Sequence, residues 1–126
     1  TTGAAKAVEE VIPDLKGKLS GMAIRVPTPN VSLVDLNLDI KKETTEQEIN
    51  TALKQASQGS LKDILGYSEE PLVSVDYVGS KYGGVVDSLT TTVTNGTLVK
   101  LIVWYDNESG FAHQLLRLAN KVSAFL

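Results

Sequence analysis

Two stretches of the sequence combine residue types that bind phosphate. "TTGAAK" places Thr2 and Gly3 at the start of an expected helix, where backbone N–H groups lack partners and the helix dipole is positive. Arg25 lies in the apolar run "MAIRV", and a guanidinium on a rigid strand is a common partner of a phosphate. Each has a plainer interpretation: Thr2 only caps the helix, and Arg25 only projects into solvent. If the sheet edge lies near the first helix, these groups converge on one anion.

A third candidate, Asn107, stands in "WYDNESGF", where two aromatics run directly into polar residues. This composition is typical of a junction between a strand and a helix. The Asn107 amide offers a donor and an acceptor to a ligand, but Asp106 or Asn107 can equally cap the helix that follows. His113 in the first turn of that helix is interpreted as a solvated surface residue. We interpret Glu69 and Glu70, which precede a proline, as part of a solvated turn.

Composition excludes several classes of function. With 126 residues and 42% apolar content, the chain is long enough for one domain with its own core. Its 12 basic and 15 acidic residues give a net charge of −3, which gives no electrostatic reason to expect a nucleic acid or an anionic membrane as partner. It has no cysteine and one histidine, which excludes disulfides, thiolate nucleophiles and multi-histidine metal sites. Without a spanning apolar stretch or a signal-like segment, we expect a cytoplasmic location.

Periodicity and turn residues predict the order helix, two strands, helix, three strands, helix. The expected helices cover residues 3–12, 45–58 and 108–126, and the expected strands cover 21–26, 31–42, 72–79, 85–94 and 97–105, with a loop over 59–71. Thr45 and Glu48 form a capping box, and Asn95-Gly96 favours a type I′ hairpin. The last strand is apolar on both faces and is therefore expected at the centre of its sheet. The fold class is α+β over residues 1–126, with a mixed, mainly antiparallel sheet and helices packed on one face.

Four stretches together resemble one family. "TTGAAKAV", "KGKLSGMAIRVPTPNVSLVDL", "EEPLVSVDY" and "LVKLIVWYDNESGF" are similar to the C-terminal part of phosphorylating glyceraldehyde-3-phosphate dehydrogenase, over nearly the whole chain. "RVPTPNVS" and "WYDNE" are the most specific. Erythrose-4-phosphate dehydrogenase shares these motifs, so the aldehyde stays open. The resemblance implies part of a glycolytic oxidoreductase that uses NAD, with NADP still open because the residues that read the adenosine ribose are not in this chain.

The resemblance also implies roles for single residues. Thr2, Gly3 and Arg25 would bind inorganic phosphate or the phosphate of a small aldehyde, and Asn107 would contact the nicotinamide carboxamide. Where the family usually reads "NEWGY", this sequence reads "NESGF". Phe111 would therefore lie beside the nicotinamide without a phenol oxygen.

The catalytic residues of the family are not found here. In the family a histidine-activated cysteine attacks the aldehyde to give a thiohemiacetal, hydride passes to NAD, and phosphate releases the acyl group. That cysteine and histidine, like the nucleotide-binding half, lie upstream of "TTGAAK". Because the chain also opens without Met, we expect it to be cut from something longer.

Two hypotheses account for the missing catalytic residues and the missing nucleotide-binding half. In the first, the chain is a segment of the enzyme, inactive alone, that works with the nucleotide-binding part of the same protein and forms a homo-oligomer through its sheet. In the second, it is a non-catalytic assembly or regulatory module.

Overall fold

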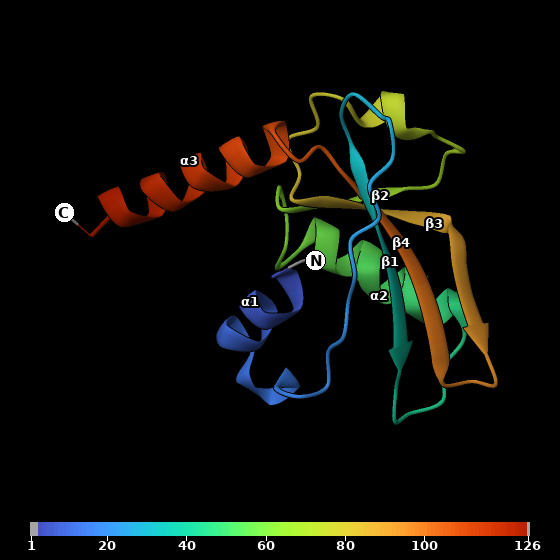
Figure 1. Cartoon of the computed structure of the whole chain (residues 1–126). Helices are drawn as coiled ribbons and strands as arrows, with labels where there is room; N and C mark the ends of the chain where they lie inside the picture. The colour runs from blue at the N-terminus through green and yellow to red at the C-terminus, as the bar shows by residue number, and fades with distance from the viewer. Residues whose placement is uncertain (1–2, 126) are drawn as a thin grey trace.

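The computed structural model describes residues 3–125 and has an α+β fold (Figure 1). Its elements, in chain order, are α1 (Ala4–Val11), η1 (Pro13–Leu15), β1 (Ser32–Asp39), α2 (Glu46–Gln58), β2 (Leu65–Ser68), η2 (Ser74–Tyr77), β3 (Gly84–Thr94), β4 (Leu98–Tyr105) and α3 (Ser109–Ser123). The four strands form one sheet in the order β1-β4-β3-β2. Two pairs are antiparallel and the β2–β3 pair is parallel, so the predicted mixed, mainly antiparallel sheet is confirmed.

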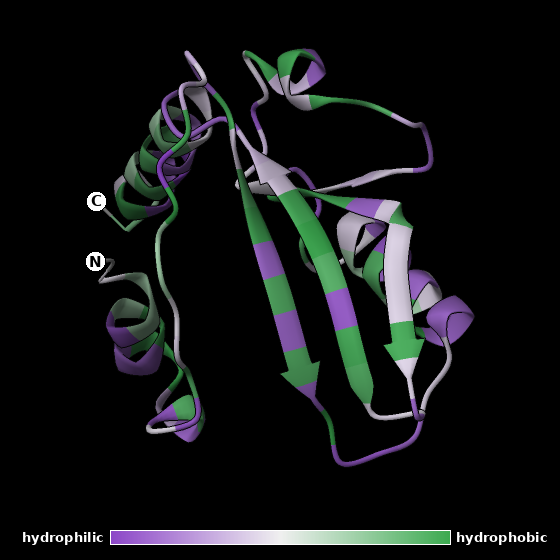
Figure 2. Cartoon of the chain, turned by 45° about the vertical axis from the view of Figure 1, so that its right-hand side comes forward, coloured by the Kyte–Doolittle hydropathy of each residue, from purple (hydrophilic) through white to green (hydrophobic). Residues whose placement is uncertain are grey.

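The elements with strong local signals form as predicted. Helix α2 begins with the expected capping box: the Thr45 hydroxyl accepts from the Glu48 N–H, and the Glu48 carboxylate accepts from the Thr45 N–H. Asn95 and Gly96 have φ values of 51° and 73°, the positive angles that a type I′ turn requires. Strand β4 lies inside the sheet, between β1 and β3, and Figure 2 shows it mostly in the green of apolar residues. Lys100 is its one charged residue.

Three expectations about strands were wrong. Residues 21–26 form no strand, and the side chains of Met22, Ile24 and Val26 are 64–78% exposed. The strand expected at 72–79 is instead the short helix η2, where the Asp76 carboxylate accepts from the Val73 N–H at 2.8 Å and closes the turn. Strand β2 occupies a segment predicted as loop.

The core lies where η2 and the start of β1 cover one end of the sheet. Val31, Tyr77 and Val85 are its buried members, and the Tyr77 and Trp104 rings stack with their centroids 5.5 Å apart. The Trp104 indole N–H donates to the Asp87 carboxylate at 3.3 Å. This cluster fixes the C-terminal end of β4, directly before the Asp106-Asn107 junction.

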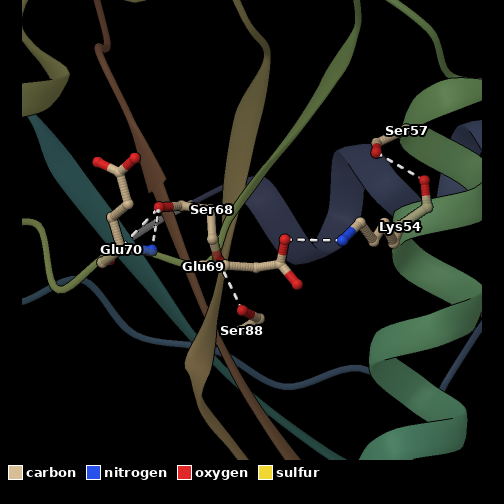
Figure 3. A network of polar contacts seen from close by, with 6 residues as sticks. All are labelled: Lys54, Ser57, Ser68, Glu69, Glu70 and Ser88. Carbon is tan, nitrogen blue, oxygen red and sulfur yellow. Dashed lines mark hydrogen bonds and ion pairs between the residues drawn. The ribbon is translucent and has the colours of Figure 1, made fainter.

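Of the three helices, α2 packs on the sheet, against β2 and β3. The Lys54 ammonium lies 2.7 Å from the Glu69 carboxylate, just beyond β2 (Figure 3). Within the sheet, the Ser88 hydroxyl donates to the Ser68 carbonyl at 2.6 Å (Figure 3). Asn50 of α2 bridges the irregular part of β3: its amide donates to the Ser88 carbonyl, and its oxygen accepts from the Thr91 hydroxyl.

Helices α1 and α3 stand away from the sheet, and α3 projects from its upper edge in Figure 1. Their apolar stripes form as predicted but remain exposed. The exposed large apolar side chains on α3 and just beyond it are Phe111, Leu115, Leu116, Leu118, Val122 and Phe125. No helix within residues 3–125 has the length and apolar content needed to cross a bilayer.

Candidate functional site

The strand-to-helix junction is organised around the Asp106 carboxylate, which is 2% exposed. One oxygen, Oδ1, accepts from the backbone N–H groups of Glu108 and Ser109 at 2.9 and 2.8 Å. Glu108 directly precedes α3 and Ser109 begins it, and N–H groups at the start of a helix lack intrahelical partners, so the Asp106 side chain caps this end of the helix. Of the two candidate caps in the sequence, Asp106 is therefore the residue that caps.

The second oxygen of Asp106 binds two other parts of the chain. Oδ2 accepts from the Asn30 side-chain amide at 3.0 Å and from the Gly79 N–H at 2.8 Å. The bonds from Gly79, Ser109, Glu108 and Asn30 hold the pKa of the Asp106 carboxyl below its ordinary value of 3.8, against the opposing effect of burial. At neutral pH the group is a carboxylate that can accept at both oxygens.

Asn107 is exposed at the turn that Asp106 holds. The Ser32 hydroxyl, at the start of β1, donates to the Asn107 Oδ1 atom at 3.5 Å, and the Asn107 amide nitrogen donates to no atom of residues 3–125. The nitrogen can therefore donate to a ligand, and the oxygen keeps a second lone pair that can accept from one. An exposed amide on a turn fixed by four hydrogen bonds can bind a ligand group that needs one donor and one acceptor.

The turn before β1 is held through Asn30. While its amide donates to Asp106, its carbonyl oxygen accepts from the Val31 N–H at 2.7 Å. Val31 is buried and has a φ of 70°, an unfavourable conformation for a β-branched residue. Such strain persists only where the surrounding contacts impose it, and here those contacts come from Asn30 and the core.

Arg25 lies in the extended segment that leads to this turn. Its side chain is exposed and makes neither a hydrogen bond nor an ion pair with residues 3–125, so its guanidinium is available to an anion. Asn30 follows Arg25 by five positions, which limits their Cα distance to about 17 Å. The position of Arg25 is thus tied loosely to the Asp106 junction.

The "TTGAAK" candidate is described in the structure from Gly3 onward. Gly3 occupies the N-cap position of α1 that was expected for Thr2, and its carbonyl accepts from the Ala7 N–H. Thr2 lies outside the described residues. No contact of residues 3–125 joins Gly3 to Arg25, so a shared anion site stays a prediction.

Phe111 and His113 both lie in the first turns of α3. The Phe111 side chain is 69% exposed. The His113 Nδ1 atom lies 2.8 Å from the Ser109 carbonyl oxygen, one turn earlier in the same helix. His113 is therefore engaged locally and is half-buried, more than the solvated position that we expected.

Three residues of the junction were not singled out as parts of a site: Asn30, Gly79 and, beyond its capping role, Asp106. The motif "TPNV" did carry a signal, because Asn side chains in turns often hydrogen-bond to nearby backbone groups. Gly79 has a φ of 80°, and its conformation presents the N–H to Asp106. Residues 3–125 contain no group of three or more histidine, aspartate or glutamate side chains arranged to hold a metal.

Comparisons with known proteins agree with the sequence motifs. The family model described as "Glyceraldehyde 3-phosphate dehydrogenase, C-terminal domain" matches residues 1–107. The chain is 57% identical over 98% of its length to glyceraldehyde-3-phosphate dehydrogenase of Geobacillus stearothermophilus and 60% identical over 94% to glyceraldehyde-3-phosphate dehydrogenase 1 of Bacillus subtilis. It is 54% identical over 98% to glyceraldehyde-3-phosphate dehydrogenase 2 of Trichormus variabilis.

The chain spans 37%, 36% and 36% of the length of these three relatives. The family match ends at Asn107, the last residue of the junction before α3, and includes the segments of Arg25 and Asn30. The motifs, the family match and the identities lead to the same conclusion: the chain belongs to the glyceraldehyde 3-phosphate dehydrogenase C-terminal domain family.

Proposed function

We propose that this chain is the segment of a phosphorylating glyceraldehyde-3-phosphate dehydrogenase that supplies contacts to the substrate phosphate and to the nicotinamide. The observation that carries the proposal is the exposed Asn107 amide on a fixed turn, with its nitrogen free to donate, in a chain that belongs to this family. The names of the relatives favour glyceraldehyde 3-phosphate over erythrose 4-phosphate as the aldehyde.

We infer that the chain binds and orients the substrate and the nicotinamide but supplies no group that attacks the aldehyde. Arg25, with Thr2 and Gly3, holds inorganic phosphate or the substrate phosphate, and Arg25 offers up to two parallel N–H donors to such a group. Asn107 fixes the face of the nicotinamide, with Phe111 as an apolar neighbour. When bound, NAD accepts the hydride that leaves the substrate. NADP would make the same contacts to these residues.

The absence of a nucleophile explains why the chain alone is proposed to be inactive. It contains no cysteine, and its single histidine is bonded within α3. We infer that the nucleophile and its base come from another part of the same protein, that this protein is cytoplasmic, and that it forms a homo-oligomer through the sheet.

A role in assembly is the second candidate, and the exposed apolar stripe of α3 favours it. Phe111 is 69% and Phe125 81% exposed, which is unusual for large apolar side chains on a surface without a partner. Such a stripe would pack on another protein surface whether or not the chain takes part in catalysis.

The proposal is tested by Asn107→Ala in the intact enzyme. We expect the KM for NAD to rise about tenfold or more, because a ligand amide loses its partners. The dissociation constant of ADP-ribose, which lacks the nicotinamide, should stay unchanged. Asn37→Ala is the matched control, because the Asn37 amide is exposed and bonds only to Asp35. An unchanged KM for NAD in Asn107→Ala would refute the nicotinamide contact.

A further inference from the structure

The two oxygens of the Asp106 carboxylate accept hydrogen bonds from different parts of the chain. Oδ1 caps α3 through Glu108 and Ser109, residues within three positions in the sequence. Oδ2 reaches Asn30, 76 residues away, and Gly79, 27 residues away. Capping a helix requires only one oxygen, so the second pair of bonds needs another explanation.

We propose that Asp106 is a positioning residue that fixes the Asn107 amide relative to the segment carrying Arg25, through the Asn30 bond. This inference rests on the proposed function, since it concerns how that site is held. The Asn30–Asp106 hydrogen bond joins the two segments that carry the proposed contacts to phosphate and to the nicotinamide. The nicotinamide contact follows Asp106 directly, and the phosphate contact lies five residues before Asn30.

The geometry makes a carboxylate necessary at this position. Four N–H donors from three segments converge on a side chain that is 2% exposed, and only a carboxylate accepts on both sides. An asparagine of the same shape would turn its NH2 group toward two N–H donors, whichever way the amide lies. Buried donors that lose their acceptor are costly, so the turn would shift to relieve them.

The backbone conformation of Val31 shows why the Asn30–Asp106 hydrogen bond matters for the position of residues 25–31. Val31, directly after Asn30, is held at a φ of 70°, which a β-branched residue leaves when it is released. Loss of the Asn30 bond would let residues 25–31 relax. It would also free the side of the junction on which Ser32 approaches Asn107.

The test is a double-mutant cycle in the intact enzyme, with Asp106→Asn, Asn30→Asp and both together. In Asp106→Asn, the new NH2 group faces N–H donors that have lost their acceptor. In Asn30→Asp, two carboxylates face each other and repel. The double variant exchanges the roles and restores one hydrogen bond between positions 30 and 106. It also keeps an acceptor for the Val31 N–H, but not for Gly79.

We expect each single variant to raise the KM for NAD about tenfold or more and the double variant to return it to within about threefold of the wild type. The dissociation constant of ADP-ribose should stay unchanged in all three, which general loss of structure would not allow. Asp63→Asn is the matched control, because Asp63 is exposed in a 3.4 Å ion pair with Lys81 and has a φ of 63° that asparagine accepts.

Three results would overturn the inference: an unchanged KM for NAD in Asp106→Asn, a double variant no better than the worse single variant, or weaker ADP-ribose binding by the same factor as NAD. If Asp106→Asn fails to fold, the comparison of Asn30→Asp with the double variant tests the inference. A double variant whose KM for NAD is no lower than that of Asn30→Asp then contradicts the role of the Asn30–Asp106 hydrogen bond. Failure of the proposed function looks different, because Asn107→Ala would then leave the KM for NAD unchanged.

Discussion

The Asn30 amide and the Asp106 carboxylate lie 3.0 Å apart although 76 residues separate them in the sequence. This bond brings the segment that follows Arg25 to the turn that carries Asn107. Both belong to the motifs that identify the family, "RVPTPN" and "WYDN". The contact thus gives a physical reason why two motifs so far apart in the chain lie side by side in the fold.

Arg25→Ala in the intact enzyme should weaken binding of phosphate and of the phosphorylated aldehyde. A charge-assisted hydrogen bond is worth about 1.5–3 kcal/mol, so the KM for either ligand should rise roughly ten- to a hundred-fold. Steady-state kinetics with each ligand varied in turn measures this change. Lys18→Ala is a suitable control, since the Lys18 ammonium donates to the Asp14 carbonyl on the exposed surface. Unchanged KM values for both ligands would exclude Arg25 from the anion site.

Gly110→Ala should destabilise the fold, although helix propensity alone predicts the opposite. A Cβ at Gly110 would lie 2.8 Å from the Tyr82 carbonyl oxygen, and backbone on both sides leaves little room to adjust. Overpacking of this kind costs about 1–3 kcal/mol, which exceeds the gain of up to about 1 kcal/mol from replacing a helical glycine. Thermal unfolding should show a lower midpoint for Gly110→Ala. Gly21→Ala, where no atom lies within 4 Å, should leave the midpoint nearly unchanged. A raised midpoint for Gly110→Ala would contradict the tight approach of α3 to Tyr82.

Through Asp106, the stability of the fold should depend on pH. Its folded pKa lies below the ordinary value of 3.8, chiefly because the Gly79 N–H donates to the carboxylate. Folding is therefore stabilised by this group above the unfolded pKa, and the stabilisation is lost as the pH falls through the folded pKa. The unfolding midpoint of the wild type should exceed that of Asp106→Asn most at about pH 6 and approach it toward about pH 3. A difference that stays constant over this range would show that the charge of Asp106 does not contribute.

Much of the fold was predictable where the signal is local. The capping box at Thr45 and Glu48 and the Asn95-Gly96 turn fix their backbone by contacts within four residues, and both are confirmed. The central place of β4 was predictable because its side chains are apolar on both faces. Asp106 or Asn107 as the cap of α3 was also predictable, since short polar side chains cap helices.

The wrong assignments of whole elements concern strands, because a strand depends on a distant partner. Met22, Ile24 and Val26 alternate as a strand would, but no part of residues 3–125 pairs with them. In η2, Asp76 closes a local turn in place of the expected strand. Strand β2 contains Gly66, a residue typical of loops, because the Val85 and Tyr82 side chains approach too closely for a Cβ. The Asn30–Asp106 bond could not be predicted either, since nothing local brings these residues together.

We propose that this chain contributes binding contacts to a dehydrogenase whose nucleophile lies elsewhere in the same protein. The most direct measurement is NADH formation by the purified 126-residue chain given glyceraldehyde 3-phosphate, phosphate and NAD, beside the intact enzyme under the same conditions. The account predicts NADH formation by the intact enzyme and none by the chain above a protein-free control. NADH formation by the chain alone, or none by the intact enzyme, would contradict it.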